Sequence, residues 1–133
     1  MRVAIDSSVL VAAAIARAGV CANLVEDVLA GHVLVLSGSI LDEVERVLCE
    51  KFAYPPEQAR HLRQFWERVA ELVEPALVPV EACRDVADLP VLGTALAGAV
   101  SVLVTVDRDL LDLCEYRGIA IRRPAGFWAV SGG

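Results

Sequence analysis

The sequence has few of the residues that many enzymes and binding proteins rely on. It contains one lysine, Lys51, and two histidines, His32 and His61. His61 falls in a polar helical stretch and His32 beside Gly31, so neither is placed as a catalytic base would be. The formal net charge of −6 argues against strong nonspecific binding to nucleic acid. It does not exclude a small acidic pocket that attracts a divalent cation.

Two further absences exclude other classes of protein. The four cysteines form no C-x-x-C pair and have no histidine nearby, which excludes a zinc site and favours free thiols in the cytosol. Apolar runs are too short to span a bilayer, and no basic region leads into a signal-peptide core at the N-terminus. We therefore expect a cytoplasmic protein that does not associate with a membrane. The cysteines are Cys21, Cys49, Cys83 and Cys114.

What the sequence does have is enough apolar residues for a folded core. Hydrophobic residues make up 56% of the chain and charged residues 23%, which excludes intrinsic disorder. Aromatic residues are only 5%, so Val, Leu, Ala and Ile must fill the core. No linker, repeat or low-complexity tract divides the 133 residues, and we predict one domain over 1–133.

Short β-branched runs alternate with segments of helical periodicity along the chain. Such alternation predicts the α/β class, with a mostly parallel sheet covered by helices on both faces. The predicted strands are 2–5, 32–36, 76–80, 101–105 and 119–122. The predicted helices are 7–19, 21–30, one from Ser39 to about Leu48, 54–75, 88–100 and 109–114.

Acidic residues follow two of these strands directly. Asp6 comes after the first strand and Asp107 after the strand at 101–105. Ligands of open α/β sheets bind outside the carboxyl ends of the strands, where both acids would lie. Each acid is alternatively a helix cap, as are Ser7 or Ser8 and, further on, Asp109. The repetition at two strands favours a functional site.

Two glutamates border the apolar stripe of the helix from Ser39. Glu43 lies between Ile40 and Val47 on one edge of that stripe, and Glu45 lies on the other edge. Asp42 points nearly opposite, toward water. Periodicity alone therefore leaves either Glu43 or Glu45 as the acid that faces a site.

A third candidate acid opens the helix of small residues at 88–100. Asp88 lies on the face shared with Leu92 and Ala95, so it begins the buried side of that helix. Capping is the structural alternative for Asp88. Asp85 is then the other candidate for the cap, with Arg84 as its ion-pair partner.

Taken together, these stretches resemble a PIN domain, in particular its VapC-like branch. "VAIDSSVLVAA" resembles the start of that family, and "LSGSILDEVERVL" resembles its helix with a serine and a later glutamate, which selects Glu43 over Glu45. "RDVADLPVLGTALAGAVSVLVTVDRDLL" is similar to the third and fourth acidic motifs and matches them to Asp88 and Asp107. "GIAIRRPAGF" resembles the closing segment.

The resemblance implies a three-layer α/β/α sandwich and a metal-dependent endoribonuclease, the toxin of a toxin-antitoxin pair. It implies an RNA substrate, an antitoxin partner and a homodimer. Oxygen-only ligands suit hard ions, so Mg²⁺ or Mn²⁺ is the expected cofactor. Asp6, Asp88 and Asp107 would bind the metal, and Glu43 would orient water or bind a second ion. Supporting roles would fall to Ser8, Thr105 and Asp109.

Three positions depart from the usual family pattern. Ser8 stands in place of an asparagine, Val106 in place of a glycine, and Leu89 in place of a further acid. These departures keep open a second hypothesis, a non-catalytic PIN-like module that binds protein or RNA within a complex. A phosphoacceptor receiver domain is disfavoured, because its chemistry needs a lysine on a late strand and Lys51 ends a mid-chain helix.

Overall fold

The structure is a computed structural model that describes residues 1–131. Six strands form one sheet in the order β3-β2-β1-β4-β6-β5. All neighbouring strands pair in parallel except β5 and β6, which are antiparallel. The mostly parallel sheet is therefore confirmed. The strands are β1 Arg2–Ile5, β2 Val33–Leu36, β3 Glu71–Leu72, β4 Val102–Val104, β5 Glu115–Tyr116 and β6 Ile119–Arg122.

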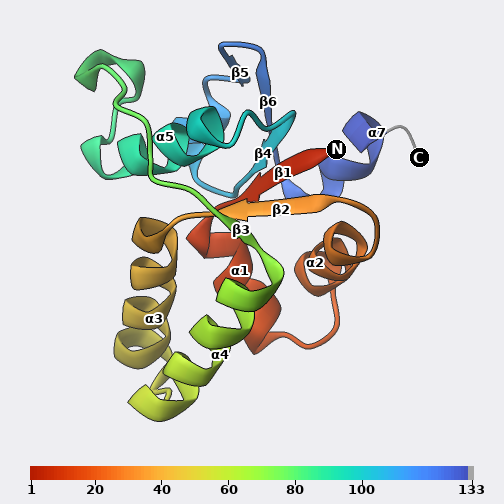
Figure 1. The fold of residues 1–133 in the computed structure, drawn as a ribbon, viewed down its shortest axis with the longest axis vertical. Helices are drawn as coiled ribbons and strands as arrows, with labels where there is room; N and C mark the ends of the chain where they lie inside the picture. Colours follow the sequence, from red (N-terminus) through yellow and green to blue (C-terminus); the bar gives the residue numbers. More distant parts are fainter. Residues whose placement is uncertain (132–133) are drawn as a thin grey trace.

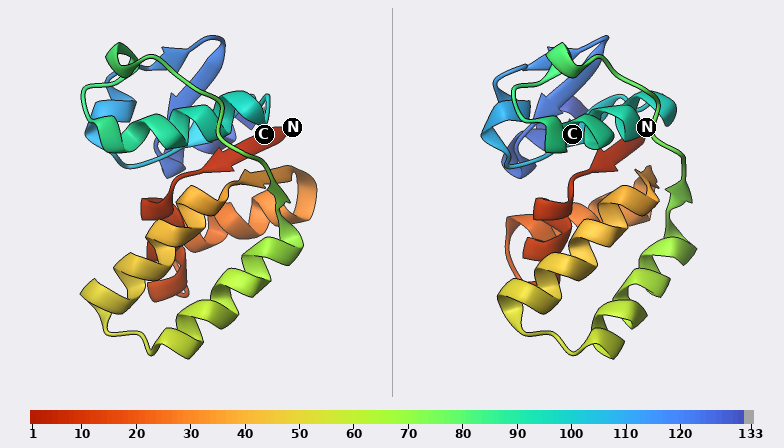
Figure 2. Two further views of the ribbon diagram at one scale, coloured as in Figure 1. Left: turned by 60° about the vertical axis from the view of Figure 1, so that its left-hand side comes forward. Right: turned by 90° about the vertical axis from the view of Figure 1, so that its left-hand side faces the viewer.

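Helices cover the sheet on both faces, which confirms the predicted α/β/α sandwich. The first four helices lie on one face and α5 lies on the other (Figure 1 and Figure 2). The helices are α1 Ser7–Ile15, α2 Val20–Gly31, α3 Gly38–Phe52, α4 Pro56–Val69, α5 Leu89–Ala97, α6 Arg108–Leu111 and α7 Phe127–Ser131. Three short 3₁₀ helices are η1 Val80–Ala82, η2 Val86–Asp88 and η3 Pro124–Gly126.

The two central strands carry the apolar runs that the sequence places there. Val3, Ala4 and Ile5 of β1 and all three residues of β4 are fully buried. Parallel strands with helices on both faces have no solvent side, which is why their sequences do not alternate. The aromatic Phe127 is also buried, 1% exposed, and belongs to the core.

Helix α1 begins at Ser7 as predicted but ends earlier than predicted. It stops at Ile15 rather than at Gly19, which instead precedes α2 with a positive φ of 130°. A glycine reaches that conformation without the strain a Cβ would impose. Of the predicted cap candidates Asp6, Ser7 and Ser8, the N-cap is Asp6, because its carboxylate accepts from the Ser7 backbone N–H.

Helix α4 is shorter than predicted, and the strand expected at 76–80 is absent. The chain leaves the helix at Val69, and Glu71–Leu72 then pairs with β2 as the edge strand β3. Of the apolar residues of this helix, Trp66 is buried but Phe65 and Val69 are more than a third exposed. Pairing of Glu71–Leu72 with the open edge of β2 ended the helix, although the helical periodicity of the sequence continues beyond it.

Helix α5 lies close to its neighbours because it is built from small residues, as its composition indicates. A Cβ on Gly93 would collide with the Ala76 carbonyl, and the Ala76 N–H donates to the Gly93 carbonyl at 2.9 Å. A Cβ on Gly98 would likewise collide with Val35 of β2. These two glycines set how near α5, and Asp88 at its start, comes to the sheet.

Within residues 1–131 no single helix is long and apolar enough to cross a membrane; α1 and α2 meet that test only as a pair bent by 108°.

Candidate metal centre

Two of the candidate acids lie side by side at the carboxyl ends of β1 and β4. These strands are neighbours in the sheet, and Ile5 is in register with Val104. The Asp6 N–H donates to the Val104 carbonyl at 2.9 Å, which ties the end of one strand to the other. From β1 the chain crosses to β2 on one side, and β4 lies on the other, so this is where the strand order reverses. Open α/β sheets bind their ligands at that point.

Thr105 connects the two acids through a single hydroxyl. Its Oγ1 donates to Asp6 Oδ2 at 2.7 Å and accepts from the Asp107 backbone N–H at 2.9 Å. Thr105 is fully buried, so no water competes for these bonds. The hydroxyl therefore fixes the Asp6 carboxylate relative to the backbone that carries Asp107. The sequence indicated a supporting part for Thr105 only through the family resemblance.

The Asp6 carboxylate accepts further hydrogen bonds from the start of α1. Ser7 donates to Oδ1 from its backbone N–H at 2.7 Å and from its hydroxyl at 3.3 Å. Ser8 Oγ donates to Oδ2 at 3.4 Å. Burial raises the pKa of Asp6 above its ordinary value, although the bonds from Thr105 and Ser7 oppose that rise. The negative charge of Asp107 raises it further.

Asp88 joins this pair from the opposite layer, at the junction of η2 and α5. It is 8% exposed, and its pKa is raised to about 7, first by burial and then by a hydrogen bond with Asp107. The charges of Asp107, Asp85 and Asp6 raise this pKa further. Three carboxyl groups from distant parts of the chain thus interact in one place. We call Asp6, Asp88 and Asp107 the acidic cup.

No basic side chain neutralises the acidic cup within residues 1–131. The ion pairs of this part of the chain include none of its three acids. Closely spaced carboxylates repel one another, and burial removes the water that would screen them. The cup must therefore hold protons or a cation. The raised pKa of Asp88 is the consequence for the metal-free protein.

A second group of acids overlaps the cup at Asp88. One carboxylate oxygen each from Asp85, Asp88 and Asp109 lies within 4.8 Å of the others. Asp85 caps η2 by accepting from the Ala87 N–H at 3.0 Å. Capping by Asp85 was one of the two alternatives predicted for this turn. The predicted pairing of Arg84 with Asp85 is wrong, since Arg84 lies 3.4 Å from Asp109. Asp109 therefore faces Asp88 and Arg84.

Cys83 is a neighbour of the cup that the sequence did not reveal. Its thiol is buried and donates to Asp88 Oδ2 at 3.9 Å. Burial raises the pKa of this thiol, which keeps it protonated at neutral pH. Scattered cysteines without a metal-binding pattern gave no signal that one of them would lie here.

The two glutamates that the sequence left as alternatives point to different surroundings. Glu45 lies 2.7 Å from Arg63 of α4, in an ion cluster away from the cup. Glu43 borders one pocket with Ser7 and Ser8, which hold Asp6, and another with Ala87, next to Asp88. Its side chain is 44% exposed and lies 3.5 Å from Arg46. Glu43 is thus the glutamate at the rim of the cup.

Buried hydroxyls hold the helix of Glu43 against the helix of Asp88. Thr94 Oγ1 of α5 lies 2.7 Å from Ser37 Oγ, and Ser37 caps α3 by accepting from the Ile40 N–H. Both residues are fully buried. The start of α3 and the start of α5 are therefore fixed relative to one another.

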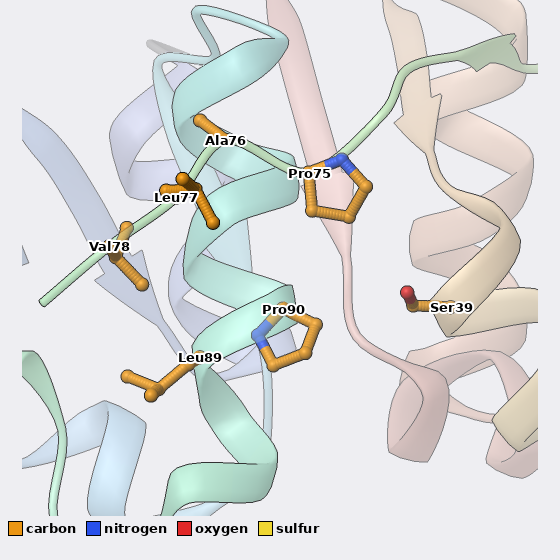
Figure 3. Close-up of a pocket in the computed structure, with 7 residues that line it drawn as sticks. All are labelled: Ser39, Pro75, Ala76, Leu77, Val78, Leu89 and Pro90. Carbon is orange, nitrogen blue, oxygen red and sulfur yellow. The ribbon is translucent and has the colours of Figure 1, made fainter. Parts of the chain in front are cut away.

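One pocket beside this site contains no acid. It has a volume of about 370 Å³ and runs between Ser39 and the segment that leads into α5. Figure 3 shows prolines and aliphatic side chains around it, with Ser39 as the one side-chain hydroxyl. It offers no titratable group for catalysis. Its lining is Ser39, Pro75, Ala76, Leu77, Val78, Leu89 and Pro90.

The donors of the acidic cup fit a hard divalent cation. Three carboxylates offer only oxygen, the ligand that Mg²⁺ and Mn²⁺ prefer, and none is already paired with a basic side chain among residues 1–131. The Cys83 thiol contacts Asp88 Oδ2, and its raised pKa keeps it protonated.

A model of the PIN domain family matches residues 2–109, which include every residue of the acidic cup. The chain belongs to the PIN domain family. The resemblance to the PIN domain inferred from the motifs is thereby confirmed.

Comparison with solved structures gives the same fold. A chain of the VapBC2 complex from Rickettsia felis, crystallised with a DNA fragment from its promoter, superposes with a TM-score of 0.67. The match covers 92% of this chain and 98% of that one at 14% sequence identity. At this identity the likeness concerns the fold. No curated protein matches the sequence.

Proposed function

We propose that this PIN domain is a divalent-metal-dependent endoribonuclease that hydrolyses phosphodiester bonds in RNA. The observation that carries the proposal is the convergence of Asp6, Asp88 and Asp107 at the carboxyl ends of β1 and β4 without a basic partner. PIN domains are generally nucleases. Phosphodiesters need a cation for hydrolysis because substrate and nucleophile are both anionic.

The residues of the cup have separable tasks in this reaction. Asp6, Asp88 and Asp107 would hold Mg²⁺ or Mn²⁺, which supplies positive charge against the phosphate during attack. Thr105 and the N–H of Ser7 keep the Asp6 carboxylate in one orientation by hydrogen bonds of 2.7 Å each. Glu43, at the rim, would accept a proton from the attacking water or hold a second ion.

We further propose that the protein acts in the cytoplasm as the toxin of a toxin-antitoxin pair. The support is its family and its fold, which it shares with a chain of the VapBC2 complex. An antitoxin protein would be its partner, and the toxin would form a homodimer. RNA would be the substrate of the toxin.

The proposal is tested by cleavage of labelled single-stranded RNA with Mn²⁺ or Mg²⁺ and with EDTA. Asp6→Asn removes a charge from the cup and keeps the side-chain shape, so we expect cleavage to fall by about a hundredfold or more, with the fold intact by circular dichroism. Asp42→Asn is the matched control, because Asp42 pairs with Arg63 away from the cup.

The wild-type protein decides between the proposed enzyme and its rival. Cleavage that needs metal and is lost in Asp6→Asn supports the nuclease. Cleavage by Asp6→Asn at the wild-type rate would remove this mechanism. RNA binding without any metal-dependent cleavage would favour the non-catalytic binding module instead.

A further inference from the structure

A second pocket adjoins the serines that hold Asp6 of the acidic cup and follows α3 away from them. It has a volume of about 350 Å³ and lies between the first turns of α1 and the second half of α3. Nothing in the proposed chemistry above uses the far half of this pocket. Its lining is Ser7, Ser8, Val11, Glu43, Val47, Lys51 and Phe52.

The near end of the pocket is part of the candidate site itself. Ser7 and Ser8, which line it, donate hydrogen bonds to the two oxygens of Asp6. Glu43, on the rim of the cup, lines the same end. The part of a polymer that extends past the cup on this side would therefore lie in this pocket.

The far end of the pocket combines a positive charge, an aromatic ring and an apolar floor. Lys51 and Phe52 form the last turn of α3, and the Phe52 ring is 47% exposed. Val11 and Val47 lie between them and the cup. Lys51 has no ion-pair partner among residues 1–131, so its charge is available to a ligand.

The spacing along the helix suits a chain that extends from the cup. Glu43, Val47 and Lys51 are four residues apart and follow one side of α3. At 1.5 Å of rise per residue, Lys51 lies about 12 Å beyond Glu43 along the helix axis. This is the scale of a nucleotide next to a scissile phosphate rather than of the phosphate itself.

We propose that this pocket is a subsite for a nucleotide flanking the scissile bond of single-stranded RNA. Its base stacks on Phe52 and its phosphate lies against Lys51. The inference rests on the proposed nuclease function and assigns part of its substrate recognition. We call Lys51 and Phe52 the stacking subsite.

The lysine and the exposed aromatic ring of this pocket suit a single-stranded nucleic acid. With a formal net charge of −6, the chain attracts a polyanion only through local basic groups, and its one lysine stands here. Single-stranded nucleic acids are bound by such a combination of cations along the backbone and exposed rings for the bases. The stacking is also tolerant of base identity, since every base has a π face.

The first test separates binding from chemistry by steady-state cleavage of a single-stranded RNA oligonucleotide. Phe52→Ala should raise KM about tenfold with little change in kcat, because it removes one stacked base. Phe52→Tyr keeps the ring and should restore KM. Phe65→Ala, which removes a phenylalanine of similar exposure from α4, is the matched control.

Lys51 is tested by the salt dependence of the same KM. Lys51→Ala should weaken binding and reduce the dependence of KM on salt concentration, since one phosphate contact releases about one counterion. Lys51→Arg should keep both. Arg60→Ala removes an exposed basic residue from α4 and serves as the control.

Photocrosslinking tests the subsite without relying on cleavage. RNA carrying 5-iodouridine at single positions is irradiated on the wild-type protein, and the modified peptide is identified by mass spectrometry. Crosslinking at Phe52 from one or two adjacent positions supports the proposal, even if no metal-dependent cleavage is found and the nuclease assignment fails. Cleavage with unchanged KM in Phe52→Ala and Lys51→Ala, and no crosslink at Phe52, would overturn the subsite and leave the nuclease intact.

Discussion

Three carboxylates lie close together in each of two places in the molecule, and the groups that neutralise or bind them differ. Between α3 and α4, Asp42, Glu45 and Glu67 surround the guanidinium of Arg63 at 2.6, 2.7 and 3.3 Å. At the end of β1 and β4, Asp6, Asp88 and Asp107 converge with neutral hydroxyl and backbone donors around them. We call the first group the Arg63 cluster.

The difference shows which group is complete. The Arg63 cluster contains its own cation: burial lowers the pKa of Arg63, but its hydrogen bonds to the three acids outweigh this and raise that pKa above its ordinary value. Among residues 1–131 the donors to the acidic cup are neutral hydroxyls, backbone N–H groups and the Cys83 thiol, and the pKa of Asp88 rises to about 7. The described chain thus provides no basic partner for the negative charge of the acidic cup, and a divalent cation would neutralise that charge.

Among the changes that compare the two groups, the largest effect should come from removing the hydroxyl that orders the cup. Thr105→Val keeps the side-chain shape but removes the donor to Asp6 Oδ2 and the acceptor for the Asp107 N–H. Bonds to a charged group are worth about 1.5–3 kcal/mol each, so we expect metal-dependent cleavage to fall at least about tenfold. Steady-state kinetics on RNA measures this.

Thr105→Ser provides the matched control because it keeps the hydroxyl. It should retain most of the activity and of the Mn²⁺ affinity. Equal activity in Thr105→Val and the wild type would mean that the cup does not depend on this bridge.

The next largest effect should fall on stability at the Arg63 cluster. Arg63→Met keeps the aliphatic stem and leaves three acids without their cation, so the free energy of unfolding should drop by about 1–2 kcal/mol. Because most of these groups are partly exposed, the loss should shrink at high salt. Urea unfolding at two salt concentrations measures it.

Arg60→Met is the control for this experiment, since Arg60 is exposed on the same helix. It should change stability by no more than about 0.5 kcal/mol. A loss of metal-dependent cleavage in Arg63→Met, with the fold kept, would contradict the separation of the two groups.

A third predicted effect is the pH dependence of the metal-free protein. The folded pKa of Asp88, about 7, lies above its ordinary value of 3.8, so folding binds a proton in this range. The contribution to stability is therefore complete below about pH 4 and is lost as pH rises through about 7. We expect the loss to be about 1–3 kcal/mol between pH 5 and pH 8.

Asp88→Asn should flatten this slope in EDTA, because the amide does not titrate. Urea unfolding of both proteins across pH 5–8 makes the comparison. A wild-type slope equal to that of the variant would show that Asp88 does not carry the raised pKa.

The sequence predicted the fold well where a single physical signal decided the outcome. The buried strands β1 and β4 have apolar runs that only a doubly covered parallel strand accommodates, and α5 has the small residues of a closely packed helix. It failed at Glu71–Leu72, where helical periodicity continued but pairing with the edge of β2 ended the helix. Edge pairing depends on tertiary position, which a local pattern does not contain.

The site was predictable in its acids but not in their surroundings. Asp6 and Asp107 could be placed by their position after strands, whereas the choice of Glu43 needed the family motif. The ion pair between Glu45 and Arg63 spans two helices and was not visible in the spacing. The contact between Cys83 and Asp88 could not be predicted either, because the loop before α5 has no periodicity that would indicate where its side chains point.

Metal binding at the acidic cup is tested most directly by thermal unfolding at pH 8 during a Mn²⁺ titration, with Asp88→Asn and Asp42→Asn alongside. Ligand binding to the folded state stabilises it by RT ln(1 + [L]/Kd), so the wild type and Asp42→Asn should gain melting temperature steadily as Mn²⁺ increases. Asp88→Asn should gain far less. A wild-type melting temperature that Mn²⁺ leaves unchanged, or equal gains in all three proteins, would contradict a metal site built from Asp6, Asp88 and Asp107.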